Sequence, residues 1–259
     1  MDSAGALQIN LYRGLALSLT ILVILFLRYR SNTLLKIAGV GMPGIIAGSM
    51  LALAGICLIQ AITTTTVAAT LFICASIPFI SAFLAWFLLN EKISKRTLIT
   101  MVIAAFGVCL MMFSGFRSNS FYGTSMALIT ALSFSGYAIV LRKNRDIEML
   151  PSIFISGFVI SLFCVSLLGT DIVIPWPDLF RCILLGSIIS LIPNSLFIYA
   201  SKYLIAAELT LFMLLEFGLG PFWVWLYINE TPAYSTLIGG FSVITAVIIY
   251  VWSEIQSKR

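Results

Sequence analysis

The chain has 259 residues, of which 61% belong to the hydrophobic set AVILMFWYC and only 10% are charged, with a formal net charge of +5. A water-soluble domain typically carries about a quarter charged residues, so this composition excludes a chain that faces water on all sides. The positive charges form short clusters between apolar runs and no basic stripe interleaved with aromatic residues, which argues against nucleic-acid binding. The sequence therefore predicts an all-α bundle of membrane-spanning helices.

Apolar runs bounded by charged, polar, glycine or proline residues predict about nine spans of about 20 residues each. The predicted spans cover residues 9–27, 37–60, 65–89, 97–115, 121–141, 151–169, 179–200, 206–228 and 235–253. The connections between them are too short to hold a soluble domain. We therefore expect residues 1–259 to form a single transmembrane domain in which consecutive helices are antiparallel neighbours.

Lysine and arginine are distributed unequally between the two sets of connections. One set and the C-terminus hold twelve of the fifteen basic residues, whereas the other set holds only Arg117 and Arg181. By the positive-inside rule, the C-terminus is cytoplasmic and the N-terminus of this chain is external. We expect a multi-pass protein of the cell (inner) membrane. Its expected partners are the lipid bilayer and a small-molecule solute, with no nucleic acid, and a homodimer is compatible with the sequence.

The residue types of catalytic and metal sites are scarce. The chain contains no histidine, which is the commonest general base and metal ligand. Its five cysteines lie in or at the edge of apolar runs, where they resemble small hydrophobic residues. No aspartate falls inside a predicted span, and neither G-x-S-x-G nor H-E-x-x-H occurs. The sequence therefore predicts no enzyme, no catalytic residue, no metal and no cofactor.

An internal repeat is visible at a shift of 139 positions. The Asn-Glu dipeptide of residues 90–91 recurs at 229–230, and the same shift places Trp86 on Trp225. Three basic residues follow the first dipeptide closely and none follows the second, as the positive-inside rule requires for turns on opposite sides of the membrane. Inverted repeats of this kind are typical of secondary transporters, whose substrate site lies between the repeats.

Short motifs in both halves extend this similarity to a known family. The first half carries Ala61, Thr63–Ala69, Ser76-Ile77-Pro78 and Leu88-Leu89-Asn90-Glu91. The second half carries Ala200, Ala206-Ala207, Leu215-Glu216, Ile228-Asn229-Glu230 and Gly239-Gly240. With these motifs the chain resembles the drug/metabolite transporter (DMT) superfamily, specifically its EamA-type members. The resemblance implies two inverted five-helix repeats, an incomplete one over residues 1–116 and a second one over residues 120–255.

The chain departs from the family pattern in two places. Phe217 stands directly after Glu216, where the family usually has proline, and Pro221 follows four residues later. The segment 11–14, which carries Arg13, resembles the start of the family's second helix, and residues 1–8 are too short to span a membrane. The first helix of the family is therefore expected to be missing. Either the reading frame is truncated or the protein is a nine-helix variant, and truncation is the favoured interpretation.

Two charged residues inside predicted spans are candidates for contact with the substrate. Glu216 lies near the middle of the eighth span, where burying a carboxylate costs on the order of 3 kcal/mol on insertion scales. It is a candidate for a substrate-amine contact or a protonation site, and the alternative is a structural carboxylate. Arg13 at the start of the first span is a candidate contact for an anionic substrate group, and the alternative is an arginine that extends to the lipid headgroups.

Polar residues beside prolines inside spans are candidates for lining a cavity. A proline frees a backbone carbonyl that water, a side chain or a ligand must satisfy, although a simple packing kink is an equal alternative. Pro78 and Pro193 are the two breaks with polar neighbours, and a tyrosine near the middle of the fifth span is a further candidate. The cavity-lining candidates are Ser76, Pro78, Asn194, Ser195 and Tyr137.

The predicted function is a secondary-active transporter that moves a small metabolite, amino acid or drug-like solute by alternating access. A non-transporting membrane scaffold is the main alternative, and an intramembrane enzyme is less favoured because no nucleophile–base pair is evident. The nucleotide-binding motif G-x-x-x-x-G-K-[ST] is absent, so a solute or proton gradient is expected to supply the energy. The low polarity of the expected cavity favours amphipathic or aromatic solutes.

Overall fold

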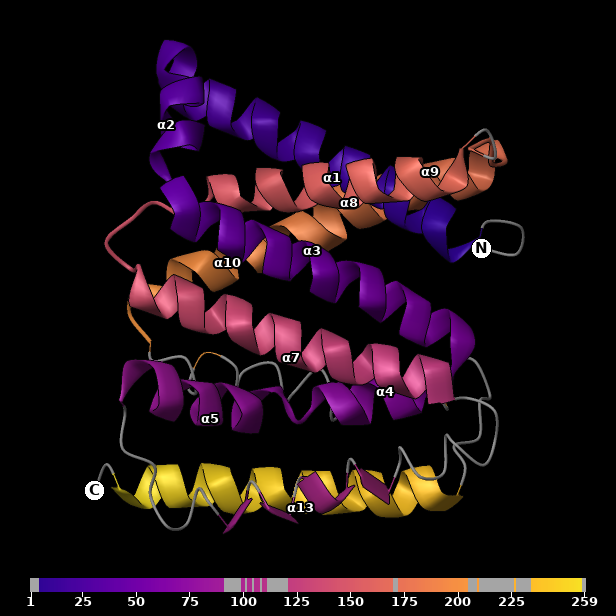
Figure 1. Cartoon of the computed structure of the whole chain (residues 1–259), viewed down its shortest axis with the longest axis vertical. Coiled ribbons are helices and arrows are strands. Elements are labelled where there is room, and N and C mark those ends of the chain that lie inside the picture. Colours follow the sequence, from indigo (N-terminus) through magenta and orange to yellow (C-terminus); the bar gives the residue numbers. More distant parts are fainter. Residues whose placement is uncertain are drawn as a thin grey trace. The chain divides into compact units, whose positions relative to one another are not determined.

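The computed structural model describes residues 5–90, 99–110 except 101, 104 and 108, 121–169, 172–204, 209, 226 and 234–257. The regular secondary structure in these residues is helical, and they include no strand. Figure 1 shows the helices, several of which are long rods. The all-α fold class expected from the sequence is confirmed.

Within the described residues, six helical segments are long and apolar enough to cross a membrane, and each overlaps one of the predicted spans. These segments are Ala6–Gly39, Gly41–Thr64, Val67–Leu89, Phe121–Lys143, Pro151–Leu168 and Trp176–Ser201. A further helix, α13 (Tyr234–Ser257), contains the shorter apolar stretch Leu237–Ala246. The predicted span at 206–228 lies outside the described residues apart from two isolated positions, and that at 97–115 is described only in part.

The first segment consists of three consecutive elements. Helix α1 (Ala6–Tyr29) is followed by the 3₁₀ turn η1 (Arg30–Asn32) and the short helix α2 (Thr33–Gly39). The Thr33 hydroxyl donates a hydrogen bond to the Arg30 carbonyl at 2.8 Å, which holds the turn. Helix α3 (Gly41–Thr64) begins at a glycine with φ 53°, a left-handed conformation that glycine adopts without steric cost. The second span therefore begins four residues later than the sequence predicts.

The third segment is two helices in place of the single predicted span. Helix α4 (Val67–Cys74) is capped by the Thr66 hydroxyl, which accepts a hydrogen bond from the Ala69 amide at 3.1 Å. Helix α5 (Ile77–Leu89) has Pro78 in its first turn, where the missing amide hydrogen costs no helical hydrogen bond. The break between α4 and α5 therefore coincides with the proline that the sequence marks as a discontinuity.

The chain divides into two compact units. Unit 1 comprises Met1–Ile59 and Val140–Leu204, and unit 2 comprises Gln60–Ile139 and Ile205–Arg259. Each unit therefore combines a segment from the first half of the sequence with a segment from the second half. Helices α3 and α7 (Phe121–Lys143) each begin in one unit and end in the other.

In unit 1, helix α1 packs along helix α8 (Pro151–Leu168). The two helices run in opposite directions, because Gly14 lies against Ser161 whereas Arg28 lies against Glu148, just before α8. Helix α1 also contacts α9 (Trp176–Leu184) and the π-helical segment η2 (Leu185–Ser190), which continues into α10 (Leu191–Ser201). One buried cluster of this unit consists of Leu11, Ala52, Ile160 and Cys164.

In unit 2, helix α13 packs against α4, and close approach depends on small residues. A Cβ added at Gly240 would lie 2.6 Å from a ring carbon of Phe72. From helix α7, the Ser135 hydroxyl lies 2.7 Å from the Ala131 carbonyl of its own helix and 3.1 Å from the Ile77 carbonyl beside the break between α4 and α5, so the two oxygens share its single hydrogen. A side chain of a neighbouring helix thus contacts the first turn of α5, beside the break.

Candidate functional site

Arg13 lies in the third turn of α1, and only 8% of the residue is exposed. Its Nη2 atom donates a hydrogen bond to Oδ1 of Asn10 at 3.1 Å. The Nδ2 atom of Asn10 in turn donates to the carbonyl oxygen of Ile56 on α3 at 3.4 Å. The guanidinium is therefore turned inward and connected to α3 through Asn10, and it does not extend along the surface toward the helix end.

Glycines on two other elements allow this buried position. A Cβ added at Gly55 of α3 would lie 2.6 Å from Nη2 of Arg13, closer than real Cβ contacts. A Cβ added at Gly186 would clash with the carbonyl oxygen of Arg13, so η2 also packs directly on this turn of α1. Gly186 lies within the π-helical segment, and such segments inside longer helices occur frequently at functional sites. The site around Arg13 is thus formed by α1, α3 and η2 within unit 1.

The charge of Arg13 has no counterion in the described part of the chain. Its hydrogen bond to Asn10 is to a neutral group, and none of the described carboxylates forms an ion pair with it. Its Nε atom is buried and has no hydrogen-bond partner among the described residues. A cation in this position requires an anion, a water-filled cavity or a substrate group to compensate its desolvation. Arg13 is therefore the strongest candidate for contact with an anionic group.

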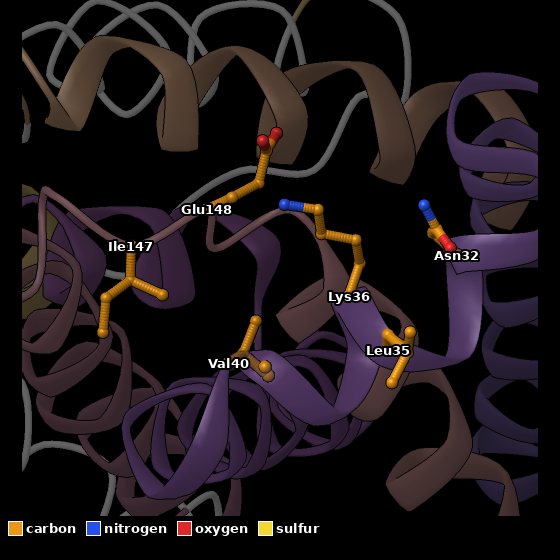
Figure 2. A pocket seen from close by; sticks show the side chains of 7 residues that line it. Asn32, Leu35, Lys36, Val40, Ile147 and Glu148 are labelled. Carbon is orange, nitrogen blue, oxygen red and sulfur yellow. The ribbon is translucent and has the colours of Figure 1, made fainter.

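Apart from the site around Arg13, unit 1 contains two cavities whose linings both include Glu148, in the connection between α7 and α8. The first, which we call the α2 cavity, has a volume of about 440 Å³ and is lined by Asn32, Lys36, Ile147 and Glu148 among others. Figure 2 shows Lys36 extending from α2 toward Glu148 across this cavity. The second, which we call the α10 cavity, is of similar volume and is lined mainly by apolar residues of α1 and α10.

The charged groups at these cavities belong to three segments of unit 1. Nη2 of Arg28, at the end of α1, lies 3.5 Å from Oε1 of Glu148. The Arg28 guanidinium and the Lys36 ammonium lie 5.3 and 5.7 Å from the centre of the Tyr29 ring, within the range of cation–π attraction. Lys202 adds a further cation at the α10 cavity. Among the described residues, no group of three histidine, cysteine, aspartate or glutamate side chains could hold a metal ion.

The predicted site residues separate between the two units. In unit 1, Ser195 lines the α10 cavity, and the side chain of Asn194 donates a hydrogen bond to the Ser190 carbonyl at 2.7 Å. This bond lies within the same helical segment, so the Asn194 amide is engaged locally. Glu216 lies outside the described residues.

Three predicted site residues belong to unit 2. Ser76 and Pro78 are buried at the break between α4 and α5, where the Ser76 hydroxyl donates to the Ile73 carbonyl at 2.6 Å. Tyr137 is fully buried, with its ring centre 5.6 Å from that of Phe134 in an edge-on arrangement. These contacts are those of helix-packing residues, and none of the three lines the α2 or the α10 cavity.

Sequence reasoning did not single out Arg28, Lys36 or Glu148 as site residues. The two basic residues indicated only which side of the membrane their connection occupies. Glu148 is an acidic residue in a connection that carries Arg142, Lys143 and Arg145, and this was the available signal. The distance of 112 positions between Lys36 and Glu148 leaves no local pattern that would pair them.

The long apolar helices, together with a charged side chain buried among them, define a polytopic α-helical membrane protein. Residues 1–113 match the EamA-like transporter family, which confirms the resemblance to EamA-type members of the DMT superfamily and implies a membrane transporter. A crystal structure of another protein is similar over 99% of this chain and 91% of that chain, with a TM-score of 0.69 and 12% sequence identity. At that identity the similarity shows the fold alone. No curated protein matches the sequence.

Proposed function

We propose that the protein is a secondary-active transporter that moves a small amphipathic solute by alternating access. The observation that carries this proposal is Arg13, a buried cation in a membrane-spanning helix with no carboxylate partner among the described residues. Intramembrane charges that face the interior of a bundle typically mark substrate or ion pathways. Arg13 also lies within the segment that matches the transporter family.

Contacts between residues 139 positions apart support inverted repeats. In unit 1, a Cβ at Gly157 would lie 2.8 Å from the backbone nitrogen of Ser18, so α1 and α8 touch at equivalent positions. In unit 2, the hydroxyl of Ser242 donates a hydrogen bond to the Ile103 carbonyl at 3.0 Å, again between equivalent positions. When a two-fold axis relates two repeats, equivalent residues touch only near that axis. We therefore propose repeats over 1–116 and 120–255, as the sequence predicts, with their substrate site near the middle of the membrane.

The composition of the α10 cavity supports an amphipathic solute. Its walls are largely apolar, with Ile21 of α1 and Leu191 of α10 among the lining residues. Arg28, Glu148 and Lys202 contribute charged groups to the same cavity. A solute with an apolar body and an ionised group would match both features. Arg13 does not line this cavity. In this proposal it contacts an anionic group of the solute at a second position along the path, and Glu216 contacts an amine or carries a proton.

The test is an untargeted comparison of metabolites inside and outside cells that express the gene from its own locus with its upstream sequence. The cells would carry the unaltered protein, Arg13→Gln, or Arg181→Gln as a matched control. Arg181 is suitable because its cation is satisfied by Asp178 at 3.2 Å. A metabolite displaced by the unaltered and control proteins, and not by Arg13→Gln, supports the proposal. No displaced metabolite, with the protein present in the membrane, contradicts transport and favours the scaffold alternative.

A further inference from the structure

The α2 cavity has the chemistry of a headgroup site at the membrane surface. It lies where the first membrane-spanning segment turns, at the end that the distribution of basic residues assigns to the cytoplasm. Lys36 and Asn32, one helical turn apart, contribute an ammonium and a carboxamide to its wall, and Glu148 faces them from the connection before α8. Figure 2 shows the polar ends of Lys36 and Glu148 close to each other, with Asn32 farther off on the other side of Lys36. Its volume of about 440 Å³ is in the range of ligand-binding cavities.

The wall of the cavity carries two charged side chains, Lys36 and Glu148, and the carboxylate is already engaged by Arg28, which lines the neighbouring α10 cavity. Glu148 is paired with Arg28, with a separation of 3.5 Å between Oε1 and Nη2. Within the described part of the chain, the Lys36 ammonium has no ion pair and lies 5.7 Å from the Tyr29 ring centre. Two cations therefore flank one ring beside a single carboxylate, which leaves one positive charge in excess. An anion of single charge would balance the group, and Lys36 and Asn32 provide hydrogen-bond donors for it.

The surface beside the cavity indicates where this anion comes from. Leu34 and Leu35 of α2 are 77% and 72% exposed, and Leu35 also lines the cavity. Leu27, near the end of α1, is 74% exposed. Exposed leucines beside a basic pocket at the end of a membrane span match an anionic headgroup that is attached to apolar chains. A soluble anion would gain nothing from this apolar rim.

We propose that the α2 cavity binds the phosphate of an anionic phospholipid of the cytoplasmic leaflet. Lys36 and Asn32 donate hydrogen bonds to the phosphate oxygens, and the acyl chains pass over Leu34 and Leu35. The Glu148 carboxylate opposes an anion, and the Arg28 guanidinium offsets this repulsion. This lipid site does not involve Arg13. It shares Glu148 with the α10 cavity, but lipid binding is measured directly, so its outcome is distinguishable from that of the transport proposal.

Native mass spectrometry of the purified full-length protein tests the proposal with three added lipids, phosphatidylglycerol, phosphatidylethanolamine and phosphatidylcholine. Lys36→Gln should weaken the binding of phosphatidylglycerol about five-fold, which corresponds to about 1 kcal/mol for one lysine at the membrane surface. Lys36→Arg should retain the binding. The matched control is Lys143→Gln, an exposed lysine at the end of α7 that does not line the cavity, and it should change binding less than about two-fold.

A variant of opposite sign sharpens the test. Glu148→Gln removes the repulsive carboxylate and should strengthen the binding of phosphatidylglycerol. Two results together would contradict the proposal: phosphatidylethanolamine binds as tightly as phosphatidylglycerol, and Glu148→Gln weakens the binding of phosphatidylethanolamine. The site would then recognise a zwitterionic headgroup. If Lys36→Gln and Lys143→Gln weaken the binding of phosphatidylglycerol equally, the effect is one of general surface charge, and the proposed site is wrong. If millimolar inorganic phosphate displaces the lipid, the site binds a soluble anion, and the proposal of a lipid occupant is wrong.

Discussion

Replacing Gly55 with alanine should move the guanidinium of Arg13 while leaving the helices in place. The new Cβ would lie 2.6 Å from Nη2 of Arg13, whereas its next neighbours, Cζ of Arg13 and Cδ1 of Ile160, would both lie at an ordinary 3.6 Å. To lengthen this contact to an ordinary 3.4 Å, Nη2 must move by 0.8 Å, which is enough to break its 3.1 Å hydrogen bond to Asn10. Because Nη2 is the end of a flexible side chain, no backbone shift is needed.

The expected change in the free energy of unfolding is small because two effects oppose each other. Loss of a hydrogen bond inside a membrane protein costs about 0.6 kcal/mol on average and at most about 1.7. Alanine in place of glycine inside a helix contributes about 0.8–1.0 kcal/mol in the favourable direction. The net change is therefore within about 1 kcal/mol, or about 2–4 °C in Tm for a chain of this size. Transport should nevertheless fall strongly, because Arg13 no longer presents its charge in the same place.

Gly157→Ala is the matched control. Its Cβ would lie 2.7 Å from the Gly14 carbonyl oxygen and 2.8 Å from the Ser18 nitrogen, so α1 and α8 must separate. Overpacking of this kind costs about 1–3 kcal/mol, which the same gain of about 0.8–1.0 kcal/mol from alanine partly offsets, so Tm in detergent should fall by up to about 8 °C. The assay is thermal unfolding followed by fluorescence, together with solute transport, for both variants. Full transport by Gly55→Ala, or destabilisation equal to that of Gly157→Ala, would refute this role for the position of Arg13.

Substitutions at three other positions test other parts of the account. Arg13→Gln should abolish transport and Arg13→Lys should retain part of it, at unchanged membrane levels; equal rates in both would show that the charge is not needed. Glu216→Gln should impair transport without reducing expression, and an unchanged rate would remove Glu216 from the mechanism. Ser135→Ala removes the hydroxyl shared between the Ala131 and Ile77 carbonyls and should lower stability by about 0.6 kcal/mol, measured as Tm. No change in Tm would show that this hydroxyl contributes little at the break.

The membrane-spanning helices were predictable because a span must be about 20 residues long and almost entirely apolar. The sequence did not reveal where helices break inside apolar runs. The turn before α3 depends on the left-handed backbone at Gly41, and the apolar residues of α2 merge into the same run in the sequence. The π-helical segment η2 also lies within a continuous apolar stretch and has no marker of its own.

The candidate site was predictable only where a single residue carried the signal. Arg13 was evident as a charge in an apolar run, but its inward direction depends on Gly55 and Gly186, which lie far away in the sequence. Lys36 and Glu148 were missed because charges in connections were read only for membrane topology. Pairing two connections requires the antiparallel packing of α1 and α8, and this contact is a property of the fold.

The most direct test of the transport proposal is efflux from liposomes that contain the purified protein and are loaded with a total metabolite extract. Liposomes without protein and liposomes with Arg13→Gln provide the two references, at matched protein incorporation for the variant. The account predicts that at least one solute leaves faster through the unaltered protein than from either reference. Release of every solute at the rate of protein-free liposomes, under both a proton gradient and a solute gradient, would contradict the account.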